Sequence, residues 1–355
     1  MTTPFLIVDS NQVPWKEITV ERSLDSAVGT FTARAPLTED VPSRPGGRAF
    51  VQVGGEGGAA AAQMLNGFVD AVSGAGSASD LEVQLAGRDR TADMADGTRL
   101  DTANAWQSST LLEIARDLAG PYGIPVRDLA GASAMNVSSL AIQPGESALA
   151  TLERAARRFG VLLGTSPDGD LTLGADRAGR AESALSTGSE GNVRSWSWSS
   201  SIDQRFHRTR VLGANDGGFG QVLGGSEIPV ATAVDPEVRS QRERVIVAQG
   251  QVVPDDCERL AAWHVSVARA RSSSVGVELP SWRQSPDGNV WRPGLLVDLT
   301  IDELEVRGEL LVAGVQLSFG SSGERAQLRL VRPESLDRDP SEGVGEAAGG
   351  FASIL

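Results

Sequence analysis

The sequence predicts a mainly β fold with an α+β insert. Three observations lead to this prediction. Short segments rich in Val, Phe and Thr recur through the first ninety residues, clusters of Gly, Pro and Ser separate them, and the hydrophobic period becomes helical after about residue 96 before strands return. Short strands at this spacing are typical of a small antiparallel barrel or sandwich.

Residues 1–95 are expected to form the first β domain, with part of 190–250 as a candidate to complete it. The glycine cluster at 54–58 lacks the Lys-Ser/Thr of a phosphate-binding loop, so we interpret it as a hairpin tip. Six strands are expected here, at 5–8, 17–22, 29–33, 49–53, 67–72 and 81–86.

Residues 96–187 are expected to form an α+β middle module of two helices and a β-hairpin. Apolar residues from Leu111 to Ala119 lie on one helical stripe, and Gly120-Pro121 ends it. A second stripe runs from Gly145 to Gly160. The turn sequence Ser-Pro-Asp-Gly at 166–169 then separates two apolar runs, which predicts the hairpin.

Residues 188–335 are expected to form a second β-rich domain with one helix near 255–271, and 336–355 a flexible C-terminal tail. The Gly, Ala and Ser-rich stretch at 174–192 is interpreted as a linker or exposed loop, and the glycine-rich stretch at 213–225 as a long loop. Strands are expected at 193–198, 206–212, 275–279, 295–301, 309–317 and 326–331.

The charge balance of the chain argues against several partners. Its 32 Lys and Arg against 46 Asp and Glu give a formal charge of -14 over 355 residues, which would repel nucleic acid and anionic lipid. The N-terminus has no basic region of a signal peptide, and no apolar run approaches the ~20 residues of a membrane span. We expect a soluble protein of a reducing compartment.

A search for catalytic or metal-binding patterns gives a negative prediction. Cys257 is the only cysteine and, on the expected helix, would stand ~10 Å from His264. His207 lies among arginines, and a structural role is expected for both histidines. The acids Asp298, Asp302, Glu303 and Glu305 lack the spacing and glycine of a calcium loop. We predict no enzyme activity, no catalytic residues, no metal site and no cofactor.

Several segments nevertheless stand in a characteristic order. The run ITVERSL at 18–24 precedes LNGFVD at 65–70 and LEVQLAGRDRTADMAD at 81–96. Later come LLEIA at 111–115, PYGIPV at 121–126, the helix at 146–160 with its DGDL turn at 168–171, WRPGLLV at 291–297, and Glu334 after LVRP. Together these segments resemble the Mu-like baseplate hub proteins of contractile-tailed phages, over about residues 5–335, and through them the spike-bearing hubs of type VI secretion systems.

The resemblance implies a homotrimer in which two β-barrel domains per chain make a pseudo-six-fold ring. Such a ring joins the six-fold tail tube, or its initiator, to the three-fold central spike, contacts other baseplate proteins and lets DNA pass without binding it specifically. The negative charge of the chain fits a lumen that repels the phosphate backbone. The implied location is the baseplate of a virion, assembled in the cytoplasm of the bacterial host and not inserted in a membrane.

The motifs also have plainer interpretations. Arg88, Arg90 and Asp93 are expected to form ordinary surface ion pairs, and Trp291 to be a core residue. In the tail, the apolar residues Phe351, Ile354 and Leu355 are a candidate docking site for a neighbouring protein or the spike, with a disordered end as the alternative.

Two other functional classes stay open. One is a tail-associated enzyme that degrades cell wall or polysaccharide with paired acids in a cleft. The other is a carbohydrate-binding β protein that would stack sugars on exposed tryptophans, with Trp196, Trp198, Trp282 and Trp291 as the candidates.

Overall fold

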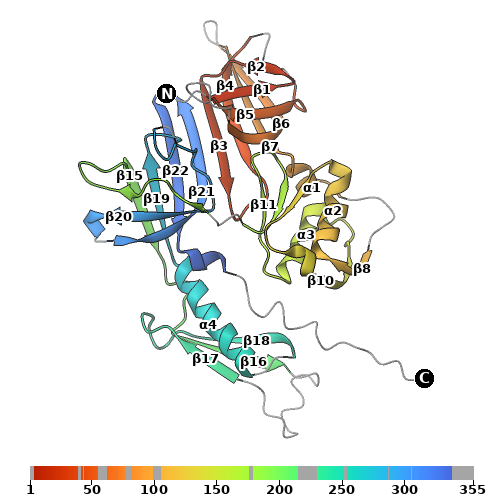
Figure 1. Cartoon of the computed structure of the whole chain (residues 1–355), viewed down its shortest axis with the longest axis vertical. Helices are drawn as coiled ribbons and strands as arrows, with labels where there is room; N and C mark the ends of the chain where they lie inside the picture. The colour runs from red at the N-terminus through yellow and green to blue at the C-terminus, as the bar shows by residue number, and fades with distance from the viewer. Residues whose placement is uncertain are drawn as a thin grey trace. The chain divides into compact units, whose positions relative to one another are not determined.

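The structure is a computed structural model (Figure 1), which describes residues 4–38, 41–42, 44–54, 62–76, 81–98, 105–175, 179–214, 230–251, 254–286, 288–304 and 306–337. The chain divides into two compact units, described separately below. Unit 1 is Met1–Ala156, Leu162–Ser197 and Val275–Leu330, and unit 2 is Arg157–Val161, Trp198–Ser274 and Val331–Leu355.

A single sheet of fourteen strands dominates unit 1, so the mainly β prediction is confirmed. Its hydrogen-bonded order is β15-β19-β22-β21-β3-β4-β7-β6-β5-β1-β2, with β20 on β21 and β13 and β14 on β20. The strands are β1 (Pro4–Val8), β2 (Asn11–Val13), β3 (Glu17–Ser23), β4 (Thr30–Pro36), β5 (Arg48–Val53), β6 (Ala62–Gly76), β7 (Leu81–Asp89), β13 (Gly179–Arg180), β14 (Leu185–Ser186), β15 (Ser195–Ser200), β19 (Ser273–Leu279), β20 (Leu295–Ile301), β21 (Val306–Gly320) and β22 (Gly323–Val331).

The two closed barrels implied by the resemblance are not present in the described residues, and this expectation is wrong. The strand order is an open path that ends at β15 and at β2. The reason lies in β21, because its residues 306–311 pair with β20 whereas 314–319 pair with β3. One long strand shared in this way joins the N-terminal and C-terminal strands into one sheet.

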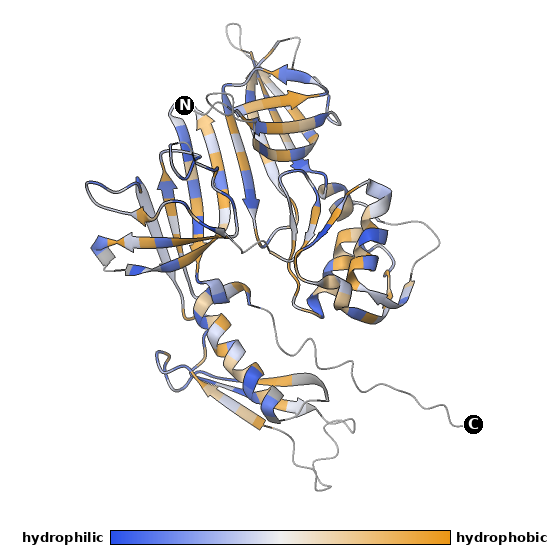
Figure 2. Ribbon diagram, in the orientation of Figure 1, coloured by the Kyte–Doolittle hydropathy of each residue, from blue (hydrophilic) through white to orange (hydrophobic). Residues whose placement is uncertain are grey.

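Residue alternation along the strands explains why this sheet has a buried face. The burial pattern of β4 and β20 alternates strictly, and Figure 2 shows the matching bands of hydrophobic and hydrophilic residues along the strands. Trp282 and Trp291 lie in the resulting core, at 0% and 2% exposure. The core interpretation of Trp291 is therefore confirmed.

Residues 92–173 hold the helices and short strands of the middle module. Its helices are α1 (Ala92–Asp96), α2 (Leu111–Ala119) and α3 (Ala148–Arg157), and its strands are β8 (Ala105–Thr110), β9 (Val126–Asp128), β10 (Asn136–Ala141), β11 (Leu163–Thr165) and β12 (Leu171–Leu173). Thr110 and Glu113 form a reciprocal capping box that fixes the start of α2. The β11–β12 hairpin is confirmed, and β9 adds to it in parallel.

The stretch at 174–192 is not a free linker in its described residues. Both β13 and β14 pair in parallel with β20. Arg180 of β13 also donates to Asp298 of β20 at 2.7 Å and to Glu309 of β21. These strands have only two residues each, so no hydrophobic period could reveal them.

Glu146 supports the beginning of α3 and gives a testable pH dependence. Its carboxylate accepts hydrogen bonds from Arg154 at 2.9 and 2.7 Å and from the Gln143 amide at 3.0 Å. The bonds from Arg154 are the main reason that the pKa of Glu146 is lowered to about 2. A carboxyl whose pKa is lowered by folding stabilises the fold above its unfolded pKa, and this contribution is lost as the pH falls towards its folded pKa.

We therefore predict that Glu146→Gln lowers the free energy of unfolding at pH 7 by about 1 kcal/mol. The difference between wild type and variant should shrink as the pH falls from about 4.5 towards 2. Thermal denaturation of both proteins across this range measures it. A difference that stays constant with pH would show that the Glu146 charge contributes nothing.

Unit 2 is built on a three-stranded sheet covered on one face by a helix. The strands β16 (Arg208–Ala214), β17 (Val230–Val234) and β18 (Glu243–Gln251) lie in the order β17-β16-β18, and α4 spans Pro254–Arg271. Cys257, Leu260 and Ala261 of α4 pack on Val211 and Ala231 of the sheet. The helix predicted near 255–271 is confirmed. None of the helices in the described part of the chain is both long and apolar enough to cross a lipid bilayer.

Candidate interaction surface

The face of the unit 2 sheet that α4 does not cover is exposed and carries five apolar residues among nine. Residues paired across neighbouring strands project to the same face, so the register defines three rows. The first row is Val230, Leu212 and Val247; the second is Thr232, Arg210 and Val245; the third is Val234, Arg208 and Glu243. We call these nine residues the open sheet face.

The valines of the open sheet face are unusually accessible. Val230, Val234, Val245 and Val247 are each more than half exposed. A contiguous apolar patch on a folded protein is a mark of a protein contact, whereas single exposed apolar residues are ordinary. In the third row, Arg208 donates to Glu243 at 2.6 Å, so an ion pair borders the patch. The open sheet face is therefore the best candidate surface for assembly.

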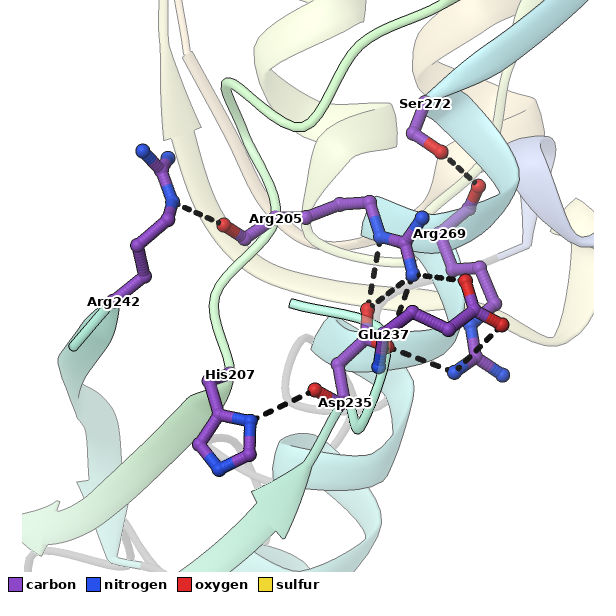
Figure 3. A network of polar contacts seen from close by, with 7 residues as sticks. All are labelled: Arg205, His207, Asp235, Glu237, Arg242, Arg269 and Ser272. Atoms are coloured by element: carbon purple, nitrogen blue, oxygen red, sulfur yellow. Dashed lines mark hydrogen bonds and ion pairs between the residues drawn. The ribbon is translucent and has the colours of Figure 1, made fainter. Parts of the chain in front are cut away.

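A buried ionic network holds the sheet of unit 2 against α4 (Figure 3). The Asp235 carboxylate, just after β17, accepts from Arg205 at 2.9 Å on both oxygens and from Arg269 of α4 at 2.8 Å. Glu237 accepts from Arg205 at 2.6 Å, and the His207 ring nitrogen Nδ1 lies 3.0 Å from the Asp235 carbonyl oxygen. Two arginines thus share one buried aspartate.

The arginines of this network keep its two acidic side chains ionised. Burial acts to raise the pKa of Asp235, but the hydrogen bonds from Arg269 and Arg205 outweigh it, so the pKa lies below its ordinary value. The hydrogen bond from Arg205 likewise lowers the pKa of Glu237. Asp235 is therefore a carboxylate at neutral pH, and its charge fixes the strand end that supports the open sheet face.

A second polar cluster, in unit 1, joins the middle module to the main sheet. The Asp89 carboxylate accepts from the Gly29 amide at 2.7 Å and from Thr91, while burial raises its pKa. Arg22 of β3 donates to the Thr165 carbonyl oxygen at the end of β11. Asn66 of β6 donates to the Asp168 carbonyl oxygen at 2.8 Å. The bonds from Arg22 and Asn66 fix the β11–β12 hairpin on the sheet.

The residues considered for catalysis or metal binding are buried or contact other side chains of the fold. Cys257 is buried under the unit 2 sheet, and the His264 ring contacts Trp263 edge-on at 4.7 Å between centroids. Asp298 pairs with Arg180, and Glu303 accepts from Thr187 at 2.8 Å. Among the described residues no group of three potential ligands is placed to hold a metal ion.

The tryptophans and arginines singled out from the sequence fall into different environments. Trp282 and Trp291 are buried, so they cannot stack on a sugar, whereas Trp198 is 56% exposed. Arg88 forms the expected ion pairs, with Asp70 and Asp96 at 2.6 Å each. In contrast, Arg90 donates to the Gly123 carbonyl oxygen. The candidate docking residues Phe351, Ile354 and Leu355, most of the 213–225 loop and most of the 54–58 cluster lie outside the described residues.

Comparison with known proteins shows which proteins this chain is similar to. A family model described as the second domain of gp44-like baseplate hub proteins matches residues 91–175, and one for the fourth domain of the Mu phage baseplate assembly protein GpP matches 254–339. The baseplate hub protein gp44 of Escherichia phage Mu is 27% identical over 358 residues, which cover 96% of this chain and 92% of that protein. The chain is a homologue of the Mu baseplate hub protein.

Two solved structures share the fold of this baseplate hub homologue. The 43 kDa tail protein of prophage MuSo2 from Shewanella oneidensis has a TM-score of 0.80 at 23% identity, with 95% of this chain and all of that chain covered. A tail protein from Neisseria meningitidis has a TM-score of 0.77 at 19% identity, with 96% and 98% covered. The predicted resemblance is thus confirmed, and the homology supports a structural role in the baseplate hub.

Sequence reasoning missed the open sheet face of this hub homologue. A signal was present, because Val245, Ile246 and Val247 are consecutive apolar residues and so supply both faces of β18. Such a run indicates a strand covered on both sides. α4 covers one side of β18, and the other side belongs to the open sheet face. The network around Asp235 left no comparable signal among 46 acidic residues.

Proposed function

We propose that this hub homologue works as a homotrimeric ring in a contractile-tail baseplate, where it adapts the six-fold tail tube to the three-fold central spike and contacts other baseplate proteins. The homology to a baseplate hub protein supports the setting, and the open sheet face is the observation that supports assembly. Burying each half-exposed valine would contribute about 1 kcal/mol. In this proposal the chain assembles in the host cytoplasm and resides in the virion.

The edges of the unit 2 sheet add to this support. Within the described residues, β17 and β18 each pair only with β16. Exposed strand edges are sites where another chain can add hydrogen bonds. The open sheet face and the two edges together offer a surface suited to a neighbouring copy of the chain.

We expect Val245→Asp to weaken self-association at least tenfold, because it replaces apolar surface of the open sheet face by a carboxylate that association would have to desolvate. Light scattering across protein concentrations measures the shift. Leu37→Asp is the matched control, because Leu37 is 54% exposed, against 59% for Val245, but lies in unit 1. Equal self-association of Val245→Asp and wild type would remove the open sheet face from the interface.

The proposal also includes passage of DNA through the ring without specific binding. The formal charge of -14 on each chain supports this, since an acidic lumen repels the phosphate backbone. The assembled protein should therefore not retain duplex DNA in a filter-binding assay at moderate salt. Salt-dependent retention would identify a basic DNA-binding surface and contradict this step.

The C-terminal tail is proposed as a docking arm for the spike or a neighbour, through Phe351, Ile354 and Leu355. Deleting residues 340–355 and measuring capture of the spike protein tests this. The docking arm predicts loss of capture, whereas unchanged capture removes it.

A further inference from the structure

A cavity of about 240 Å³ in unit 1 has walls of a distinctive chemical kind. It lies where the end of β3, the β9–β12–β11 sheet and the loop before β20 meet. Arg22, Arg127 and Arg292 line it, and none of the described lining residues is Asp or Glu. In a chain with 46 acidic and 32 basic residues, three arginines around one cavity form a marked local concentration of positive charge.

Hydrogen bonds within unit 1 hold two of these arginines in place. Arg127 donates to Asp170 at 2.6 Å and to Asp168 at 3.0 Å. Arg22 donates to the Thr165 carbonyl oxygen. Guanidinium groups fixed in this way lose little side-chain entropy when they bind an anion.

Aspartates that do not line the cavity balance part of this positive charge: Asp168 and Asp170 lie beside Arg127, and Asp89 lies near Arg22. The pKa of Arg22 is lowered to about 10, mainly because the residue is buried. The nearby Arg292 contributes to this lowering, whereas Asp89 and Asp168 oppose it. The charged form of Arg22 is thus disfavoured where it stands. An anion in the cavity would relieve this cost by Coulombic attraction at short range in a poorly solvated place.

The rest of the wall is partly apolar and partly hydroxylic. Leu24, Leu129, Pro167 and Pro293 supply apolar surface, and hydroxyl groups come from Ser23, Thr165, Ser166 and Thr172. Arginines match the planar oxygens of a carboxylate, and the apolar walls match a hydrocarbon stem. A bare inorganic ion would leave those apolar walls without a partner.

We propose that this cavity binds a carboxylate carried on a short apolar stem. The same chemistry is offered by a glutamate side chain of a neighbouring protein chain and by a small free organic acid. Arg22, Arg127 and Arg292 all line this one cavity.

The test uses butyrate as the carboxylate and butyramide, its neutral isostere, as the matched ligand. Saturation-transfer NMR on the full chain at constant ionic strength should show saturable butyrate binding and no butyramide binding. Arg292→Gln should weaken butyrate at least tenfold, since one hydrogen bond between charged groups accounts for that much affinity. Arg307→Gln is the control, because Arg307 is largely exposed outside the cavity.

A second variant, at another residue, keeps the test from depending on Arg292→Gln alone. Leu129→Asp adds a carboxylate at the wall of the cavity, at a half-exposed site, and should abolish butyrate binding. Equal binding of butyrate and butyramide, or butyrate binding that neither variant weakens, would overturn the proposal. Formate, a carboxylate without a stem, that binds as tightly as butyrate would also overturn it, by showing that the stem contributes nothing.

The mass of the assembled species in solution distinguishes the two possible sources of the carboxylate. This measurement rests on the proposed homotrimeric assembly. A glutamate from a neighbouring chain predicts that saturating butyrate competes and lowers the mass of the assembled species, with butyramide inert. A free organic acid predicts an unchanged mass together with the same NMR result.

Discussion

Replacing Asp235 by Asn is expected to lower the free energy of unfolding of unit 2 by about 3–5 kcal/mol. The Asp235 side chain is 2% exposed, and the Arg205 side chain that it binds is 8% exposed. The substitution keeps the shape of the side chain but removes the charge, so Arg205 becomes a buried cation without its buried counter-ion. Arg269 loses its shorter ion pair as well. Urea denaturation followed by circular dichroism, with amide exchange on β16–β18, measures the loss.

Glu237→Gln is the matched control for this prediction. Glu237 contacts the same two arginines, but its side chain is 61% exposed, so water replaces the lost interaction. We expect a change of at most about 1 kcal/mol. Equal effects of the two substitutions would mean that burial does not decide the strength of this network.

Trp282→Ala should destabilise unit 1 by about 3–5 kcal/mol. Trp282 is fully buried in the core of the main sheet, and its indole N–H donates to the Ser318 carbonyl oxygen of β21 at 2.9 Å. The substitution leaves a large void and a buried carbonyl group without its donor. Because β21 joins β20 to β3, the damage should reach both halves of the sheet.

Trp198→Ala supplies the comparison on an exposed tryptophan. Trp198 is 56% exposed, and its loss should change the free energy of unfolding by less than about 0.5 kcal/mol. Thermal denaturation of both variants beside wild type distinguishes the two sites. A small effect of Trp282→Ala would show that Trp282 does not stabilise the core. The sugar-stacking interpretation of this residue would then be open again.

Local signals explain which parts of the fold were predictable. The α2 helix was predicted because its stripe and its ending glycine are adjacent in sequence, and Thr110 and Glu113 cap it within one turn. The β11–β12 hairpin was predicted because its turn sequence lies between the strands. The pairing of β21 with β3 was not, because it joins residues almost 300 positions apart that carry no mutual signal.

The candidate surfaces were less predictable than the elements that carry them. The open sheet face depends on which side of β16–β18 the helix α4 covers, and alternation alone does not decide this. The arginine-lined cavity requires three segments, near residues 22, 127 and 292, to converge. Separately, each of these arginines is an ordinary charged residue in a strand or loop.

The mass of the purified chain in solution, measured by light scattering over a range of concentrations, tests the proposed homotrimeric ring most directly. The proposal predicts a species of about three times the chain mass of 37.1 kDa, which Val245→Asp dissociates and Leu37→Asp does not. A species of 37.1 kDa at every concentration would contradict it.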